Sequence, residues 1–180
     1  TFETLGLSSP ILNALIPLGY QKPTPVQAKV IPLVLEGKDV IATAQTGTGK
    51  TAAYALPLLQ LLSKKTPKEN SKRNIRGLVL VPTRELASQV YNAMLDYSAN
   101  MDIVTIAIYG GVKLTPQTTK LQKGADVLIA TPGRLIEHLQ MGHLDLAKVE
   151  LLVFDEADRI LDMGFWKEVE MLLEQMPKKR

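Results

Sequence analysis

The sequence has no cysteine and only two histidines among its 180 residues. This excludes a disulfide framework and a metal site made of thiolates. Aromatic residues make up only 5% of the chain, and no apolar run reaches the roughly 20 residues that a membrane helix needs. With 46% hydrophobic residues the chain can bury a substantial core. We expect one globular domain in the cytoplasm, with no membrane partner.

The net charge of +3 does not by itself indicate nucleic-acid binding. Residues 63–77 hold six basic residues against one acidic residue, and residues 178–180 add three more basic residues. The remainder of the chain is net acidic. A short basic run of this kind is typical of a solvent-exposed linker. Binding to nucleic acid must therefore be inferred from particular sites.

A phosphate-binding loop is the strongest pattern in the chain. The apolar residues 39–43 predict a short buried strand and residues 51–62 predict a helix. The glycines between them let successive backbone N–H groups point at an anion near the start of the helix. In such a loop the lysine contacts the β- and γ-phosphates of a nucleotide, and the following hydroxyl ligates Mg²⁺. The loop consists of Ala44, where a glycine is usual, Gln45, Thr46, Gly47, Thr48, Gly49, Lys50 and Thr51.

Four further apolar stretches predict strands, at residues 77–81, 103–108, 126–130 and 151–154. Each is followed by helix-like sequence. Continuous apolar strands that alternate with helices predict an α/β fold, with a parallel sheet covered by helices on both faces. The carboxyl ends of parallel strands lie at one edge, where ligands bind. We therefore expect the phosphate loop and the polar segments after these strands to share that edge.

Three of these polar segments have the features of phosphate sites. Thr83 and Thr131 are predicted helix N-caps, with Arg84 and Arg134 in the first turns, and an arginine at a helix N-terminus binds phosphate well. The Gly-Gly pair at 110–111 lets a ligand approach the backbone. Ordinary capping explains each segment alone, whereas three at one edge favour a sugar-phosphate backbone bound without sequence specificity. The segments comprise Pro82, Thr83, Arg84, Gly110, Gly111, Thr131, Pro132, Gly133 and Arg134.

Two carboxylates follow the last predicted strand. Asp155 is suited to hold Mg²⁺ together with Thr51, and Glu156 is suited to orient and activate an attacking water. An Asp-Glu pair at a strand end is weak evidence alone. Combined with a phosphate loop earlier in the chain, it indicates nucleotide hydrolysis, with Lys50, Asp155 and Glu156 as the catalytic candidates.

The start of the chain contains a candidate adenine site. Ser9-Pro10 and Thr24-Pro25 each predict a helix start, with the hydroxyl residue as N-cap. Gln27 then lies in the first turn of the second helix, and its amide matches the N6 and N7 edge of adenine. Tyr20 is placed to stack on a base. The alternatives are a tyrosine that packs and a glutamine that faces water. The histidines, 138 and 143, are expected at the surface without a metal.

With these segments the chain resembles the DEAD-box RNA helicases, which are named after the tetrad that stands here at residues 155–158. Phe2 corresponds to the family's isolated aromatic upstream of its adenine-reading Q motif, which matches residues 19–27. Residues 44–51 match the ATP-binding motif, and the three phosphate-site segments match the RNA-backbone motifs. Residues 161–165 are also typical of the family. Within it, the chain looks most like bacterial RhlE-type members.

The resemblance implies an ATP-dependent RNA helicase in which ATP clamps two RecA-like domains on RNA, with local melting of short duplexes. It implies ATP and Mg²⁺ as cofactors, and RNA and a second RecA-like domain of the same chain as partners. Residues 1–180 would form the first RecA-like domain, with a Q-motif lead-in over 1–37 and a P-loop core over 38–180. The family's Ser-Ala-Thr segment and second domain are absent from this sequence. We therefore expect a piece of a longer protein that is nearly inactive alone.

Two other functions are compatible with the motifs. One is a different P-loop ATPase that acts on DNA or protein, and the other is a non-catalytic nucleotide-binding module that regulates partners. The segment with Gln27 argues for adenine and against GTP, and the three backbone sites argue against a purely regulatory role. The choice of RNA over DNA depends on 2′-hydroxyl contacts, so it rests on the resemblance. The sequence does not predict an oligomeric state.

Overall fold

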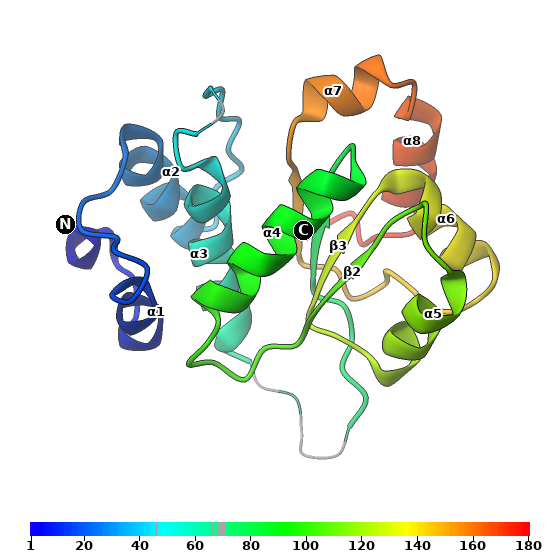
Figure 1. Cartoon of the computed structure of the whole chain (residues 1–180), viewed down its shortest axis with the longest axis horizontal. Coiled ribbons are helices and arrows are strands. Elements are labelled where there is room, and N and C mark those ends of the chain that lie inside the picture. The colour runs from blue at the N-terminus through cyan, green and yellow to red at the C-terminus, as the bar shows by residue number, and fades with distance from the viewer. Residues whose placement is uncertain (46, 66, 68–70) are drawn as a thin grey trace. The chain divides into compact units, whose positions relative to one another are not determined.

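The structure is a computed structural model that describes residues 1–45, 47–65, 67 and 71–180 (Figure 1). The chain forms two compact units. The first consists of Thr1–Thr66 with Asn92–Ile103, and the second of Pro67–Tyr91 with Val104–Arg180. In the described part of the chain, no helix has the length and apolar character needed to cross a bilayer.

The first unit is helical. Thr24 caps α2, since its hydroxyl accepts from the Gln27 backbone N–H while the Gln27 side chain accepts from the Thr24 N–H. Ser8, and not the expected Ser9, stands at the cap position of α1, so Ser9 is already helical. Because the two serines are adjacent, the sequence alone could not separate them. The elements are η1 (Phe2–Leu5), α1 (Ser9–Leu15), α2 (Pro25–Leu35), α3 (Lys50–Ser63) and the end of α4 (Arg84–Tyr97).

The predicted strand at residues 39–43 is wrong. These residues have no regular secondary structure, and the Ile41 side chain is 98% exposed. An apolar run becomes a strand only where a neighbouring strand pairs with its backbone N–H and C=O groups. In the described part of the chain, the single sheet contains four other strands and no ladder to residues 39–43.

The second unit is built on a parallel sheet, which confirms the predicted α/β fold. The strands are ordered β2-β3-β1-β4, and every neighbouring pair is parallel. Helices flank the sheet, as each strand is followed by a helix. The strands are β1 (Gly77–Leu80), β2 (Thr105–Ile108), β3 (Val127–Ala130) and β4 (Leu151–Phe154), and the helices are α4, α5 (Leu114–Lys123), α6 (Pro132–Gln140), α7 (Ala157–Asp162) and α8 (Trp166–Glu174).

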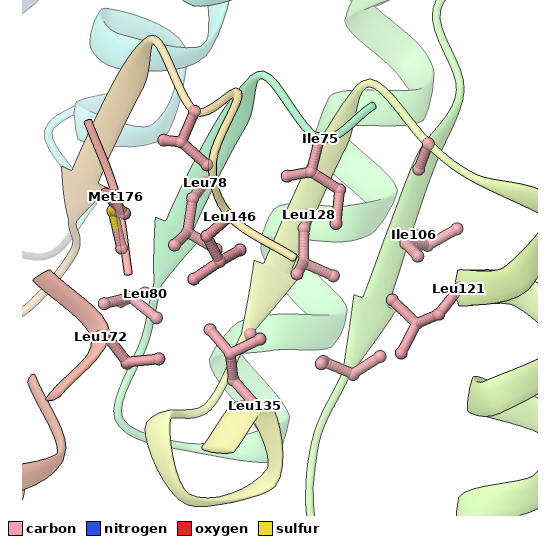
Figure 2. Close-up of a cluster of buried hydrophobic side chains, with 14 of the residues drawn as sticks. Ile75, Leu78, Leu80, Ile106, Leu121, Leu128, Leu135, Leu146, Leu172 and Met176 are labelled. Atoms are coloured by element: carbon pink, nitrogen blue, oxygen red, sulfur yellow. The ribbon is translucent and has the colours of Figure 1, made fainter. Parts of the chain in front are cut away.

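The core explains why these strands read as continuous apolar runs. Figure 2 shows one sheet face, where Leu78, Leu80 and Leu128 pack with side chains from helices such as Leu135 and Leu172. Residues that point to the opposite face of the sheet, such as Val79 and Ile129, are also fully buried. Both faces of the central strands are therefore covered, which removes the polar alternation of a half-exposed strand.

A buried carboxylate ties the basic run to the sheet. Asp126 is fully buried and forms ion pairs with Arg73 Nη1 at 2.6 Å and Arg76 Nη2 at 3.0 Å. It also accepts from the Val104 N–H at 2.8 Å. The expectation that residues 63–77 are only a solvated linker is therefore wrong for Arg73 and Arg76, because a buried carboxylate requires charged or hydrogen-bonding partners.

We predict that Asp126→Ala lowers the free energy of unfolding by about 3–5 kcal/mol, because it leaves two partly buried guanidinium groups without their carboxylate. Chemical denaturation measures this change. Asp145→Asn is the matched control, since among the described contacts the exposed Asp145 carboxylate accepts only a local N–H, from Ala147, which an amide oxygen also accepts. Equal stabilities of the two variants would contradict the prediction.

Candidate phosphate and nucleic-acid sites

The phosphate loop leads directly into α3. Gly47 and Gly49 both have a φ of +84°, in the left-handed region that glycine adopts without strain. Gly49 is the N-cap of α3, so Lys50 and Thr51 form its first turn. The Thr48 hydroxyl donates to the Gln45 carbonyl at 2.6 Å and braces the turn. Thr46 lies outside the described residues.

Gln27 links this loop to α2. Its side chain is nearly buried, with Oε1 accepting from the Thr24 N–H at 2.9 Å and Nε2 donating to the Gly49 carbonyl at 3.2 Å. A methyl group at Gly49 would collide with the Gln27 amide. Gln27 therefore does not face water, and its position depends on the loop that it was expected to serve. A contact with adenine stays a prediction.

Tyr20 packs against other aromatic rings, which was the structural alternative. Its ring stacks on the buried Phe2 with centroids 6.0 Å apart, and its hydroxyl lies 2.8 Å from that of Tyr97. Burial, and then the hydrogen bond with Tyr20, raise the pKa of Tyr97, so that phenol stays protonated. Phe2 and Tyr20, which were both assigned to the candidate adenine site, are therefore in contact. Tyr97 was not predicted, because it is distant in sequence.

In the second unit the polar segments reach one edge of the sheet. The parallel ladder continues one residue past three of the strands, with the N–H groups of Val81, Thr131 and Asp155 donating to the Ala130, Ile108 and Leu80 carbonyls. The segments that follow the four strands therefore start at the same level, as predicted. The predicted position of the phosphate loop at this edge stays a prediction.

The two predicted phosphate-binding arginines differ in their surroundings. The Arg84 side chain is 51% exposed, and its Nη1 lies 3.1 Å from the point where a methyl group on Gly111 would stand. The Arg134 side chain is 10% exposed, and its Nη1 donates to the Val112 carbonyl at 2.9 Å and to Gln117 Oε1 at 3.2 Å. Arg84 is thus exposed beside the turn at Gly110–Gly111. Arg134 is mostly buried and bonds Val112, the residue that follows this turn.

The helix starts that carry these arginines also differ. The Thr83 hydroxyl accepts from the Leu86 N–H at 3.3 Å and so caps α4, as predicted. Thr131 is the N-cap of α6 and is followed by Pro132 and Gly133, but its side chain makes no capping hydrogen bond with the described residues. The N–H groups at the start of α6 are thus not capped by the threonine.

The two carboxylates at the end of β4 belong to adjacent residues, and the second residue, Glu156, has a strained backbone. Asp155 is buried, whereas the Glu156 side chain is 29% exposed and lies 3.4 Å from Arg159 Nη1. Glu156 has a φ of +53° and is the one non-glycine residue with positive φ in the described ranges. A glutamate in this conformation carries a conformational cost, and such residues cluster at functional sites.

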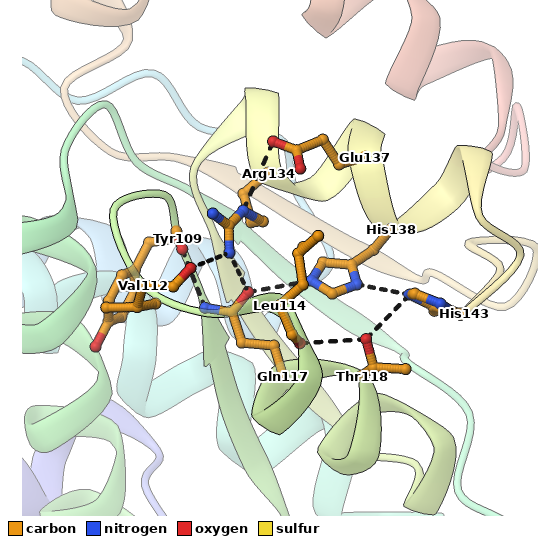
Figure 3. Close-up of polar contacts among 9 residues, drawn as sticks. All are labelled: Tyr109, Val112, Leu114, Gln117, Thr118, Arg134, Glu137, His138 and His143. Carbon is orange, nitrogen blue, oxygen red and sulfur yellow. Dashed lines mark hydrogen bonds and ion pairs between the residues drawn. The ribbon is translucent and has the colours of Figure 1, made fainter.

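A network of polar contacts connects the residues on either side of the Gly110–Gly111 turn to α5 and α6, and Figure 3 shows its members. His138 is fully buried, so the expectation that both histidines lie at the surface is wrong. His138 Nε2 lies 3.1 Å from Gln117 Oε1, and its Nδ1 lies 2.8 Å from His143 Nδ1. Burial lowers the pKa of His138, and the nearby His143 and Arg134 lower it further. Gln117 was not predicted either, since it lies in a mostly polar helix.

We predict that Gly49→Ala destabilises the chain more than Gly47→Ala. Both variants carry the same left-handed strain, about 1–2 kcal/mol, because both glycines have a φ of +84°. A methyl group meets nothing within 4 Å at Gly47, but at Gly49 it collides with Gln27. The end of the Gln27 side chain can move away only by giving up its bond to the Gly49 carbonyl, so the extra loss is about 1 kcal/mol. Chemical denaturation of both variants measures it, and equal losses would show that the Gln27 contact is not formed.

Comparison with known proteins agrees with these motifs. The chain matches the DEAD/DEAH box helicase family over residues 24–180. It is 49% identical over 179 residues to the ATP-dependent RNA helicase DeaD of Escherichia coli K12, covering 99% of this chain and 28% of that protein. It is 48% identical to the probable ATP-dependent RNA helicase ddx27 of Dictyostelium discoideum, covering 100% of this chain and 23% of that protein.

A plant protein shows a similar relation. The DEAD-box ATP-dependent RNA helicase 40 of Arabidopsis thaliana is 41% identical over 180 residues, with 100% of this chain and 16% of that protein covered. The chain therefore spans at most 28% of the length of these three relatives. Because the family match extends over most of the residues and includes both the phosphate loop and the carboxylate pair, the chain belongs to the DEAD/DEAH box helicase family.

Proposed function

We propose that this chain is the first core domain of an ATP-dependent RNA helicase. It binds ATP with Mg²⁺ and the RNA backbone, and it unwinds short duplexes only together with a second RecA-like domain. Family membership and the helicase names of the relatives support this proposal. The observation that carries it is the strained backbone of Glu156 directly after the buried Asp155, since a structural turn would not require a glutamate there.

In this proposal the nucleotide is held by residues whose chemistry fits it. Lys50 contacts the β- and γ-phosphates, and the loop N–H groups surround them. Thr51 and Asp155 supply hard oxygen donors, which suit Mg²⁺ because that ion binds one or two protein oxygens and keeps several waters. Glu156 orients and activates the attacking water.

Gln27 retains the capacity to bind adenine. An amide oxygen accepts two hydrogen bonds and an amide nitrogen donates two. Among the described contacts Gln27 uses one of each, toward Thr24 and Gly49, which leaves one acceptor position and one N–H for a ligand. Phe2 and Tyr20 add a stacked aromatic pair to this proposed adenine site.

The proposed RNA contacts involve the sugar-phosphate backbone. Arg84 is exposed beside the Gly110–Gly111 turn, and both α4 and α6 begin at the same sheet edge. These groups recognise phosphate charge and backbone shape, so they favour binding without sequence specificity. The remaining members of the set are Pro82, Thr83, Thr131, Pro132, Gly133 and Arg134, the last of which acts through Val112 and Gln117.

The finer expectations remain proposals. The relatives reported above carry the names DeaD and ddx27, so the assignment to the RhlE type stays a prediction. The cytoplasmic location and the boundary at residues 37–38 stay predictions too. The alternatives are a P-loop ATPase that acts on DNA or protein, and a regulatory nucleotide-binding module without catalysis.

We predict that RNA, and not DNA, stimulates ATP turnover by the full-length protein that carries this chain. Lys50→Ala should lower the stimulated rate by about a hundredfold or more, because the γ-phosphate loses its cation. Lys38→Ala is the matched control, since Lys38 pairs with Glu36 in an exposed position. A steady-state phosphate-release assay measures the rates with RNA and with DNA and the rates of both variants.

The outcomes separate the candidate functions. Equal stimulation by DNA favours a different P-loop ATPase, and nucleotide binding without turnover favours the regulatory module. Glu156→Gln should retain ATP binding while losing turnover, which distinguishes a role in chemistry from a role in binding. Residues 1–180 alone should hydrolyse ATP negligibly, and rapid RNA-stimulated turnover by them would contradict the proposed need for a second domain.

A further inference from the structure

The buried network behind the glycine turn has only one consistent arrangement of donors and acceptors. Gln117 lies between Arg134 Nη1, which only donates, and the Tyr109 carbonyl, which only accepts. The amide oxygen of Gln117 must therefore face Arg134, and its nitrogen must face Tyr109. The opposite orientation would oppose two donors at one end and two acceptors at the other.

This orientation fixes the tautomers of both histidines. Gln117 Oε1 is an acceptor, so His138 Nε2 carries a hydrogen and donates to it across 3.1 Å. In neutral His138, Nδ1 is then the acceptor. His143 Nδ1, at 2.8 Å, must carry the hydrogen and donate to it. Thr118 fits this arrangement, because its hydroxyl donates to the Leu114 carbonyl and leaves its lone pairs toward His143 Nδ1 at 3.3 Å.

The network holds both ends of the Gly110–Gly111 turn. Gln117 Nε2 donates to the Tyr109 carbonyl before the glycines, at 3.0 Å. Arg134 Nη1 donates to the Val112 carbonyl after them, at 2.9 Å. The Gln117 amide joins these two contacts, because its Oε1 accepts from the same Arg134 Nη1 and also from His138. The conformation of the turn therefore depends on the position of that oxygen.

We propose that His138 is a positioning residue for RNA binding, whose Nε2–H locks Gln117 so that Gln117 and Arg134 hold the Gly110–Gly111 turn in its RNA-contacting conformation. This inference rests on the proposed function, since it assumes that the turn contacts RNA. His138 itself is fully buried, so it acts only through Gln117.

The arrangement also gives the turn a dependence on pH. A proton added to His138 goes to Nδ1, which can then no longer accept from the His143 Nδ1–H at 2.8 Å. It also places a positive charge in a buried site close to Arg134. The Nε2–H toward Gln117 remains, so acid weakens the network by favouring conformations in which His138 leaves this buried site. The charged groups that act on His138 are His143 and Arg134, which oppose its protonation, and Glu137, which favours it. From α5 it meets Gln117, which does not titrate, and Thr118 lies on the far side of His143.

The groups around His138 determine in which direction the RNA affinity changes with pH. Because the pKa of His138 is lowered from 6.5, His138 is neutral and the network intact at neutral pH. The network is lost only as the pH falls below 6.5 toward the lowered value, so RNA affinity should decline on the acid side. Removing the ring of His138 should abolish that decline.

The test is the equilibrium affinity of the full-length protein for single-stranded RNA, with a non-hydrolysable ATP analogue, by fluorescence anisotropy from about pH 8 to about pH 5.5. His138→Leu should weaken binding about threefold to tenfold at neutral pH, the effect of one lost hydrogen bond. His138→Gln keeps a donor for Gln117 but does not titrate, so it should restore most of the affinity and flatten the acid decline. His143→Ala should move the decline to higher pH.

Thr119→Ala is the matched control, because the Thr119 hydroxyl bonds only the Thr115 carbonyl of its own helix among the described contacts, whereas Thr118 reaches His143. It should leave affinity and pH profile unchanged. An acid decline that persists unchanged in His138→Gln would overturn the inference, even if His138→Leu fails to fold.

Two measurements separate this inference from the proposed function. If Arg84→Ala weakens RNA binding and His138→Leu does not, the inference fails while the RNA site stands. If neither Arg84→Ala nor His138→Leu changes the affinity, the RNA-contacting turn itself is refuted, and the inference falls with it. Nitrogen NMR of labelled histidines, without RNA, should find the Nε2–H form of His138 and the Nδ1–H form of His143, and the reverse forms would overturn the network.

Discussion

The register of the parallel backbone ladder is the constraint on which the second unit depends. Gly77 in β1 pairs with Val127 in β3 and with Leu151 in β4, so the three strands begin and end at the same level. Since their carboxyl ends point the same way, residues far apart in sequence reach one edge without any contact between their side chains. The location of the candidate RNA residues therefore follows from hydrogen bonds made by apolar residues.

Three buried polar residues then connect elements that the ladder does not fix. Asp126, Gln27 and Gln117 are each at most 6% exposed, and each bonds groups distant in sequence. Burial of an unpaired polar group is costly, so each of these residues holds its partners in defined positions. For Gln27 and Gln117 the partners belong to candidate ligand sites. A structural role and a functional role are therefore combined in the same amide, and evidence for one is not evidence against the other.

The sequence predicted the features that depend on local pattern. The strands of the sheet and the cap at Thr24 follow from apolar periodicity and from capping chemistry, which act over a few residues. The strand at 39–43 failed because strand formation needs a partner that local pattern does not supply. The burial of His138 was detectable, since it stands three residues after the buried Leu135 on the same face of α6. Its partner Gln117 was not, because it lies 21 residues away in the chain.

The two arginines show where pattern ends and tertiary context begins. Arg84 and Arg134 occupy the same local setting, the first turn of a helix after a parallel strand, yet their side chains are 51% and 10% exposed. The difference comes from the acceptors Val112 and Gln117, which withdraw the Arg134 guanidinium from solvent. Under the proposed function, a phosphate at α6 would then meet the backbone N–H groups at its start, and a phosphate at α4 would meet a guanidinium. The same local pattern, an arginine in the first turn of a helix after a strand, thus gives a site with an exposed cation at α4 and a site without one at α6.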